Sequence, residues 1–153
     1  MRSLALWLAV FLSRWQRSGA QSCINDIAVL SKQEAAVTDT SVQRTYILCP
    51  RTIYTVGTLD LNYNLVGFNV MPSIPVRPNL TVRCGDTGSV DNLCWIIDGD
   101  VHVDATNYLG VTAPSVDNVL IEGFVFIGTL KHSFWATKPG NITFRNCEWR
   151  VGF

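Results

Sequence analysis

The chain has 153 residues, 48% of them hydrophobic and 16% charged, which is enough apolar material to build one compact domain. This composition excludes an intrinsically disordered segment, a coiled coil and a collagen-like repeat. Because 12 Lys and Arg side chains balance 12 Asp and Glu side chains, the net charge does not point to a nucleic-acid or anionic-membrane binder.

The first twenty residues have the pattern of a secretory signal peptide. A basic start precedes an apolar run from Leu4 to Leu12, and the small residues Ser18 and Ala20 suit a signal-peptidase groove. The apolar run is much shorter than the roughly 20 residues that span a bilayer. We therefore predict a signal peptide over residues 1–20 and a secreted chain with no transmembrane segment; an ordinary amphipathic N-terminal helix is the alternative.

Residues 21–48 are predicted to form an N-terminal cap segment. The apolar residues Ile27, Leu30 and Ala35 alternate with Lys32 and Glu34, which favours a short helix. Such a helix would cover the open end of the β-structure that follows. A loosely ordered leader is the alternative.

Five cysteines follow the predicted cleavage point, which fits an oxidising compartment. We favour the pairs Cys23–Cys49 and Cys84–Cys94. Cys147 is then left over, and either its partner lies in sequence outside this chain or it is a buried free thiol. No CxxC spacing occurs, so a zinc site is not expected.

From position 50 onward the apolar residues come in short alternating runs, which predicts β-strands. The segment that begins at Asn118 overlays the segment that begins at Asn141 at an offset of 23 residues (141 − 118). In this overlay Gly123 lies opposite Asn146, at a bend that suits φ > 0. The overlay places four pairs of apolar residues together: Val119 with Ile142, Ile121 with Phe144, Phe124 with Cys147, and Phe126 with Trp149.

A period of about two dozen residues predicts a solenoid of parallel strands in which equivalent residues lie above one another. Earlier units fit less tightly: Trp95 lies 24 residues before Val119 (119 − 95), and Tyr54 lies 26 before Leu80 (80 − 54). A small antiparallel β-sandwich is the alternative, but it would need more hairpin dipeptides than the single Asp98-Gly99.

Four segments resemble the repeating units of the right-handed parallel β-helix of pectin-lyase-like proteins: Asn79–Gly85, Cys94–Gly99, Asn118–Gly128 and Asn141–Cys147. The resemblance covers roughly residues 45–153. It implies an all-β, right-handed parallel β-helix solenoid of few coils over residues 49–153, with a short N-terminal capping helix. Because members of this fold usually have many more coils, the resemblance also implies that the domain is incomplete at its C-terminal end.

The strand that contains Asp98, Asp100, His102 and Asp104 is the strongest candidate for chemistry, since these side chains would line one outer face. The resemblance implies that functional carboxylates lie on such an outer groove. Adjacent carboxylates suit calcium or general acid–base catalysis, although no cofactor is predicted. The alternative is an ordinary half-buried strand with polar residues facing outward.

Two further features bear on carbohydrate. Lys131 lies in a predicted loop just before Trp135, whose exposed aromatic ring could stack on a sugar. The alternative is a tryptophan packed against the next coil. The sequons at Asn79 and Asn141 are acceptors for N-linked glycans in a secreted protein.

These observations predict a secreted β-helix module that binds, or is associated with, extracellular polysaccharide and has no assigned catalysis. One alternative is the N-terminal fragment of a polysaccharide lyase or hydrolase, to whose site Asp98, Asp100 and Asp104 contribute. The other is a structural cell-surface or wall protein. No nucleic-acid partner is predicted, and the sequence leaves the oligomeric state open.

Overall fold

A computed structural model describes residues 22–55, 74–97, 103–105, 115–128, 133–136 and 140–151. The predicted signal peptide lies outside these residues. The described chain contains one α-helix, α1 (Ile27–Ala35), one short 3-10 helix (Val90–Asn92) and eleven strands, β1 to β11. No helix in this part of the chain is both long enough and apolar enough to cross a bilayer.

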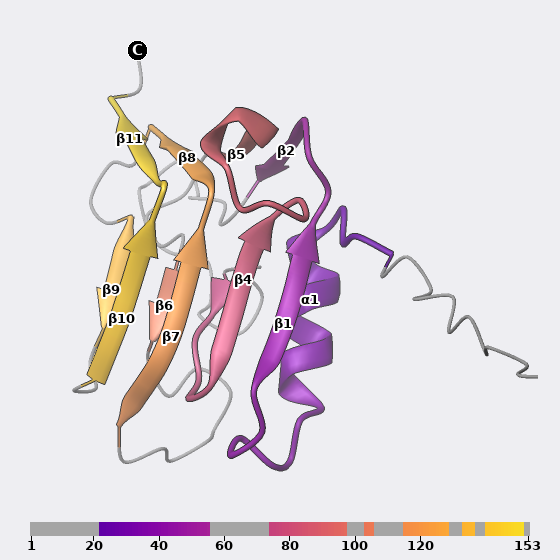
Figure 1. Cartoon of the computed structure of the whole chain (residues 1–153), viewed down its shortest axis with the longest axis vertical. Helices are drawn as coiled ribbons and strands as arrows, with labels where there is room; N and C mark the ends of the chain where they lie inside the picture. Colours follow the sequence, from indigo (N-terminus) through magenta and orange to yellow (C-terminus); the bar gives the residue numbers. More distant parts are fainter. Residues whose placement is uncertain are drawn as a thin grey trace, which may run out of the picture.

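The first sheet carries the candidate site and consists of four parallel strands side by side (Figure 1). Its pairs are all in parallel register, so that each residue lies beside its counterpart on the next strand. In spatial order the strands are β1 (Arg44–Leu48), β4 (Leu80–Cys84), β7 (Val116–Glu122) and β10 (Gly140–Arg145).

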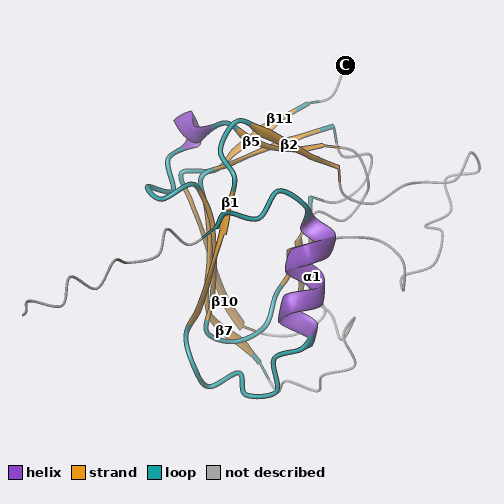
Figure 2. Cartoon of the chain, turned by 90° about the vertical axis from the view of Figure 1, so that its right-hand side faces the viewer, coloured by secondary structure: helices purple, strands orange, loops and turns teal. Residues whose placement is uncertain are grey.

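Two more parallel sheets accompany the first. The second sheet lies at an angle to the first, and α1 stands on the inner side of the first sheet (Figure 2). The second sheet consists, in spatial order, of β11 (Glu148–Arg150), β8 (Phe124–Ile127), β5 (Cys94–Ile97) and β2 (Thr52–Thr55). The third consists of β3 (Ile74–Pro75), β6 (Val103–Ala105) and β9 (Phe134–Ala136).

The predicted 23-residue offset is confirmed for the last strands. Ile142 pairs with Val119, Phe144 with Ile121, and Trp149 with Phe126. The bend residues also behave as predicted, because Gly123 (φ 82°) and Asn146 (φ 52°) both adopt left-handed backbone conformations. Every pairing between described strands is parallel, which excludes the antiparallel sandwich.

The earlier alignments were wrong. Trp95 pairs with Val125 rather than with the strand of Val119, and Tyr54 pairs with Ile96 rather than with Leu80. The physical reason lies in the connections. Paired residues of the first sheet are 36 (80 − 44), 39 (119 − 80) and 23 (142 − 119) positions apart, so no single offset could find all the pairs.

The predicted fold class, an all-β right-handed parallel β-helix solenoid, is wrong. The described residues form two parallel sheets of four strands, a smaller third sheet and the helix α1, and no solenoid is identified among them. The helix buries Ile27 and Leu30 in the common core. The sequence period could not decide the class, because equivalent residues become neighbours in any in-register parallel sheet.

The local sequence explains where α1 begins and which of its faces packs on the core. Asp26 is its N-cap, and the Asp26 carboxylate accepts a hydrogen bond from the Ala28 backbone N–H at 2.8 Å. Ile27 and Leu30 face the core one turn apart, while Val29 is partly exposed. This helix lies within the segment predicted as an N-terminal cap, as does β1.

Two disulfides reinforce the fold at the C-terminal ends of the neighbouring strands β1 and β4. Cys23 is bonded to Cys49, next to the end of β1, and Cys84 at the end of β4 is bonded to Cys94 at the start of β5. These are the pairs favoured from the sequence. Each closes a loop in the unfolded chain and so reduces the entropy gained on unfolding.

The core can be tested at Phe126, a fully buried residue whose ring stacks on Trp149 with centroids 5.4 Å apart. Phe126→Ala is expected to lower the free energy of unfolding by about 3–5 kcal/mol, because it leaves a cavity among packed rings. Ile53→Ala on the exposed side of β2 is the control and should cost less than about 1 kcal/mol. Urea unfolding measures both, and similar losses in the two variants would contradict the described core.

Candidate functional site

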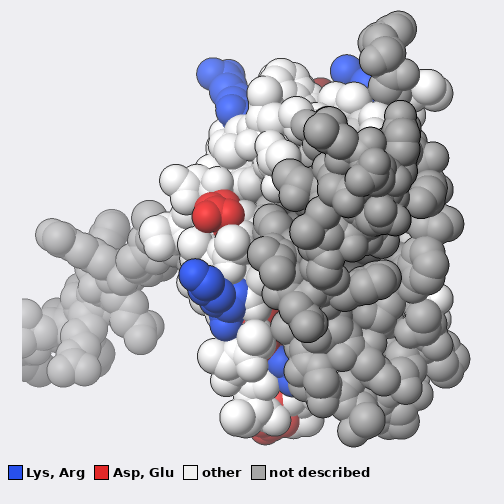
Figure 3. Space-filling model, turned by 180° about the vertical axis from the view of Figure 1, so that it is seen from behind, with Lys and Arg blue, Asp and Glu red and all other residues white. Residues whose placement is uncertain are grey.

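A groove of about 450 Å³ lies on the outer face of the first sheet, the face turned to the viewer in Figure 1 and away from α1. Figure 3 shows the opposite side of the molecule, where the described basic and acidic side chains lie singly and intermixed. The groove differs, because its lining contains two arginines and no carboxylate. The lining residues are Gln43, Thr45, Thr81, Arg83, Asn118, Val119, Leu120, Asn141, Thr143 and Arg145.

The alternation of each strand places these polar side chains on one face. Thr45, Thr81, Leu120 and Thr143 lie in one row across the four strands. The intervening residues point inward, as Val82 and Ile121 show by being fully buried. The first sheet therefore turns a row of three threonines and Leu120 to its outer face and an apolar row to the core, with Thr81 itself nearly buried.

The next outward row contains a charged cluster. Arg83, Glu122 and Arg145 are aligned on β4, β7 and β10. Arg83 Nε lies 3.0 Å from Glu122 Oε2, and Arg145 Nε lies 2.6 Å from Glu122 Oε1. The Glu122 side chain is only 4% exposed, whereas those of Arg83 and Arg145 are 31% and 54% exposed. One buried carboxylate thus holds two guanidinium groups toward the groove.

The protonation of Glu122 follows from these contacts. Burial alone would raise its pKa, but the hydrogen bonds and charges of Arg145 and Arg83 outweigh burial and hold the pKa below its ordinary value of 4.5. Gly88 packs directly against Glu122, since a Cβ on Gly88 would collide with the carboxyl group. The carboxylate is therefore confined between a glycine backbone and two arginines.

The opposite margin of the groove is lined by amide side chains. Asn118 Nδ2 donates to Asn79 Oδ1 at 2.8 Å and to Gln43 Oε1 at 3.0 Å. Gln43 Nε2 in turn donates to Thr81 Oγ1 at 3.2 Å. Asn79 and Asn118 both have φ 57°, a left-handed conformation that asparagine tolerates better than most residues. This row connects β1, β4 and β7 near their N-terminal ends.

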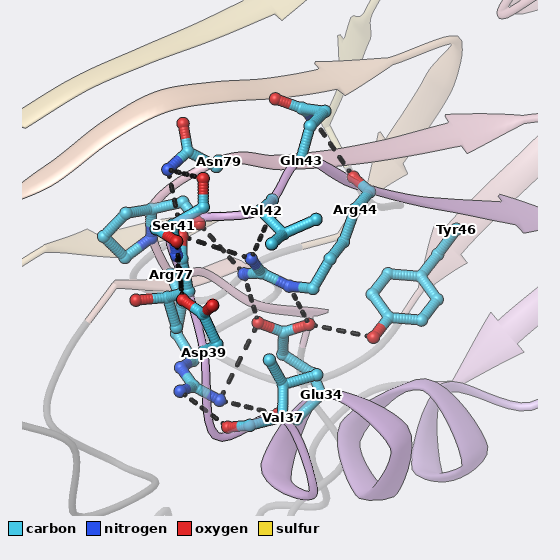
Figure 4. A network of polar contacts seen from close by, with 12 residues as sticks. Glu34, Val37, Asp39, Ser41, Val42, Gln43, Arg44, Tyr46, Arg77 and Asn79 are labelled. Atoms are coloured by element: carbon cyan, nitrogen blue, oxygen red, sulfur yellow. Dashed lines mark hydrogen bonds and ion pairs between the residues drawn. The ribbon is translucent and has the colours of Figure 1, made fainter.

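A buried network behind β1 supports this margin (Figure 4). Glu34, the last buried residue of α1, accepts hydrogen bonds from Arg44 Nη2 at 2.7 Å and from Tyr46 Oη at 2.9 Å. Arg77 Nη1 donates to the Glu34 backbone carbonyl at 2.6 Å and lies 3.9 Å from its carboxylate. Burial, together with the hydrogen bond and charge of Glu34, raises the pKa of Tyr46 to about 12.

Arg44 transmits this support to the chain around the groove. Its guanidinium donates to the backbone carbonyls of Val42 at 2.8 Å and Pro78 at 2.9 Å. These carbonyls directly precede Gln43, which lines the groove, and Asn79, which binds the groove residue Asn118. α1 is thereby fastened to the N-terminal ends of β1 and β4 through one carboxylate.

The structure describes only part of the site predicted from the sequence. Asp98, Asp100, His102 and Lys131 lie outside the described residues. Asp104 and Trp135 are aligned partners on the parallel strands β6 and β9, so the chain brings their backbones together, but their side chains lie outside the described part. Where side chains are described, no three His, Cys, Asp or Glu residues are grouped as a metal site would require.

Sequence reasoning missed the groove. The repeated Arg and Thr residues of β4 and β10 were its signal, because Arg83 and Arg145 flank Glu122 in register. That signal depends on aligning β4 with β7, and the long connection between them hid the alignment.

Cys147 remains unpaired within the described residues and is half-buried against the core. Burial raises the pKa of its thiol. Cys147 is therefore expected to be a thiol of low reactivity. This position fits both a buried free thiol and a cysteine whose partner lies outside this chain.

The charged cluster makes a pH-dependent prediction. A carboxyl group whose folded-state pKa is lowered stabilises the protein above its unfolded-state pKa, and this contribution is lost as the pH falls. Glu122→Gln should therefore lower the free energy of unfolding at pH 7 by about 1.5–3 kcal/mol, and the difference from wild type should shrink below about pH 4.5. Urea unfolding across this pH range measures it, and a constant difference would contradict the arrangement.

The Glu34 network makes a second prediction. Glu34→Gln removes the charge that two buried arginines face and should cost about 3–5 kcal/mol in the free energy of unfolding. Gln33→Ala, on the exposed side of the same helix, is the matched control and should stay within about 0.5 kcal/mol of wild type. Equal effects of the two variants in urea unfolding would show that the network does not fasten α1.

Comparison with known proteins finds no matching protein family, no matching curated protein and no matching solved structure.

Proposed function

We propose that this chain is an extracellular protein whose first sheet binds an acidic polysaccharide. The groove carries the proposal: it offers threonine hydroxyls, asparagine and glutamine amides and two arginines, and its lining contains no carboxylate. Hydroxyl and amide groups suit the hydroxyls of sugars, and guanidinium groups suit the carboxylates or sulfates of acidic sugars.

The electrostatics of the cluster support an anionic ligand. The two guanidinium groups of Arg83 and Arg145 share one carboxylate, that of Glu122, which leaves one positive charge in excess (2 − 1). Because Glu122 is buried and both arginines are partly exposed, the positive groups reach solvent and the negative group does not. A ligand in the groove would therefore meet a positive surface.

The spacing of the strands supports a chain-like ligand. Adjacent parallel strands lie about 4.8 Å apart, so equivalent side chains repeat at that distance across the sheet. Thr45, Thr81 and Thr143 repeat the same hydroxyl on three of the four strands. A polymer of similar sugar units could make the same contact more than once along such a row.

The extracellular part of the proposal is supported by the two disulfides, which form and persist in oxidising compartments. Binding and turnover can be separated by experiment. Incubation with a polyuronate, with and without calcium, should release neither unsaturated nor reducing ends if the protein is a binding module. Release of either product would instead support a lyase or hydrolase.

The groove is tested by binding to polygalacturonate, with a neutral β-glucan as the uncharged probe. Arg145→Gln should weaken polygalacturonate binding roughly tenfold by removing a charge-assisted contact. Arg150→Gln on β11 is the matched control, because Arg150 is similarly exposed but lies outside the groove and pairs with Glu148.

Affinity measured by calorimetry at two salt concentrations completes the test, since ionic contacts at an exposed site weaken with salt. Equal affinity for the neutral glucan, or equal losses in Arg145→Gln and Arg150→Gln, would contradict the proposed site.

A further inference from the structure

We infer that the folded protein carries an N-linked glycan on Asn141 and none on Asn79. The inference goes beyond polysaccharide binding. It shares with that proposal the extracellular location and one edge of the groove, which Asn141 lines. Both sequons are formally equivalent in the sequence, Asn79-Leu80-Thr81 and Asn141-Ile142-Thr143. The structure separates them, because the two asparagines make very different contacts.

The side-chain amide of Asn79 is fully used. Its Nδ2 donates to the backbone carbonyls of Thr40 at 2.9 Å and Ser41 at 3.3 Å, and its Oδ1 accepts from Asn118 at 2.8 Å. Thr81, the third residue of this sequon, is buried at 9% exposure. A sugar on Nδ2 would have to occupy the position of the Thr40–Ser41 backbone.

The environment of the Asn141 side chain is the opposite of that of Asn79. It is exposed on β10, the last strand of the first sheet, at a point where the register with β7 shifts between Gly140 and Ile142. Its backbone N–H donates to Asp117 Oδ1 at 3.1 Å, and its side-chain amide makes no hydrogen bond within the described residues. Asn141 and Thr143 both line the groove, so the outer face of this sequon is open.

The chemistry of the transfer explains why these contacts matter. The amide nitrogen of asparagine attacks the anomeric carbon of an oligosaccharide carried on a lipid pyrophosphate. A nitrogen–carbon bond forms, the bond from the sugar to the pyrophosphate breaks, and one amide proton leaves with the pyrophosphate. No oxidant or reductant takes part. The glycosylated nitrogen keeps one N–H.

One remaining N–H could not donate to both Thr40 and Ser41. Because transfer precedes complete folding, a glycan placed on Asn79 would oppose the native contacts of β4 with the loop before β1. Chains modified there should therefore fail to reach the folded, secreted pool. A glycan on Asn141 costs no described side-chain contact.

The experiment is site mapping of the full chain secreted from a eukaryotic host. The intact mass is measured before and after treatment with an N-glycan amidase, which converts each glycosylated asparagine to aspartate, and peptides that contain each sequon are analysed. The expected result is one glycan, on Asn141. Asn141→Gln and Thr143→Ala should both remove it, and Thr143→Ser, which preserves the sequon, should retain it.

A glycan on Asn79 in the folded secreted protein would overturn the inference, as would a secreted wild-type chain with Asn141 unmodified. A chain that is not secreted and carries no glycan would overturn it too. None of these readouts uses polysaccharide binding, so a groove that binds no polyuronate leaves the inference intact.

Discussion

Parallel backbone pairing in register is the constraint from which the rest of this structure follows. It places each residue of the first sheet beside its counterparts on neighbouring strands, and the two-residue period of a strand then separates those rows onto two faces. One set of rows is apolar and packs against α1 and the second sheet. The other set is polar and lines the groove. Core and candidate site are therefore two faces of the same four strands.

Two buried carboxylates stabilise this sheet from different sides. Glu34 connects the helix to β1 through Arg44, and Glu122 connects β4 to β10 through Arg83 and Arg145. Each is shielded from water and satisfied by guanidinium donors, which is the condition under which a buried charge is tolerated. Their consequences differ. The network around Glu34 faces inward and positions the margin of the groove. The cluster around Glu122 instead presents its two arginines to solvent.

The groove and the sequon at Asn141 share one surface. A glycan on Asn141 would stand on β10 at one end of the groove, beyond the row of amides that holds β1, β4 and β7 together. The arginines lie in a different row, toward the C-terminal ends of the strands. Asn141 and Arg145 are both on β10, so a glycan on Asn141 would border the part of the groove that an acidic ligand would occupy.

Pattern and spacing alone predicted strands from position 50 onward, the parallel pairing of the last two units, the left-handed bend at Gly123 and Asn146, and the helix near Glu34. They did not predict β1, which lies in the segment expected to be a cap. These features are local, or they join segments separated by a short and regular connection. The sequence also led to both disulfide pairs. It led to the wrong fold class, because an in-register repeat is common to several parallel architectures.

Only the tertiary structure decided which distant residues meet. Arg83 and Glu122 are 39 positions apart (122 − 83), and Glu34 and Arg77 are 43 apart (77 − 34). No period relates these pairs, because connections of unequal length separate them. The two sequons, identical in pattern, differ for the same reason: the loop that occupies the amide of Asn79 comes from a part of the chain nearly forty residues earlier.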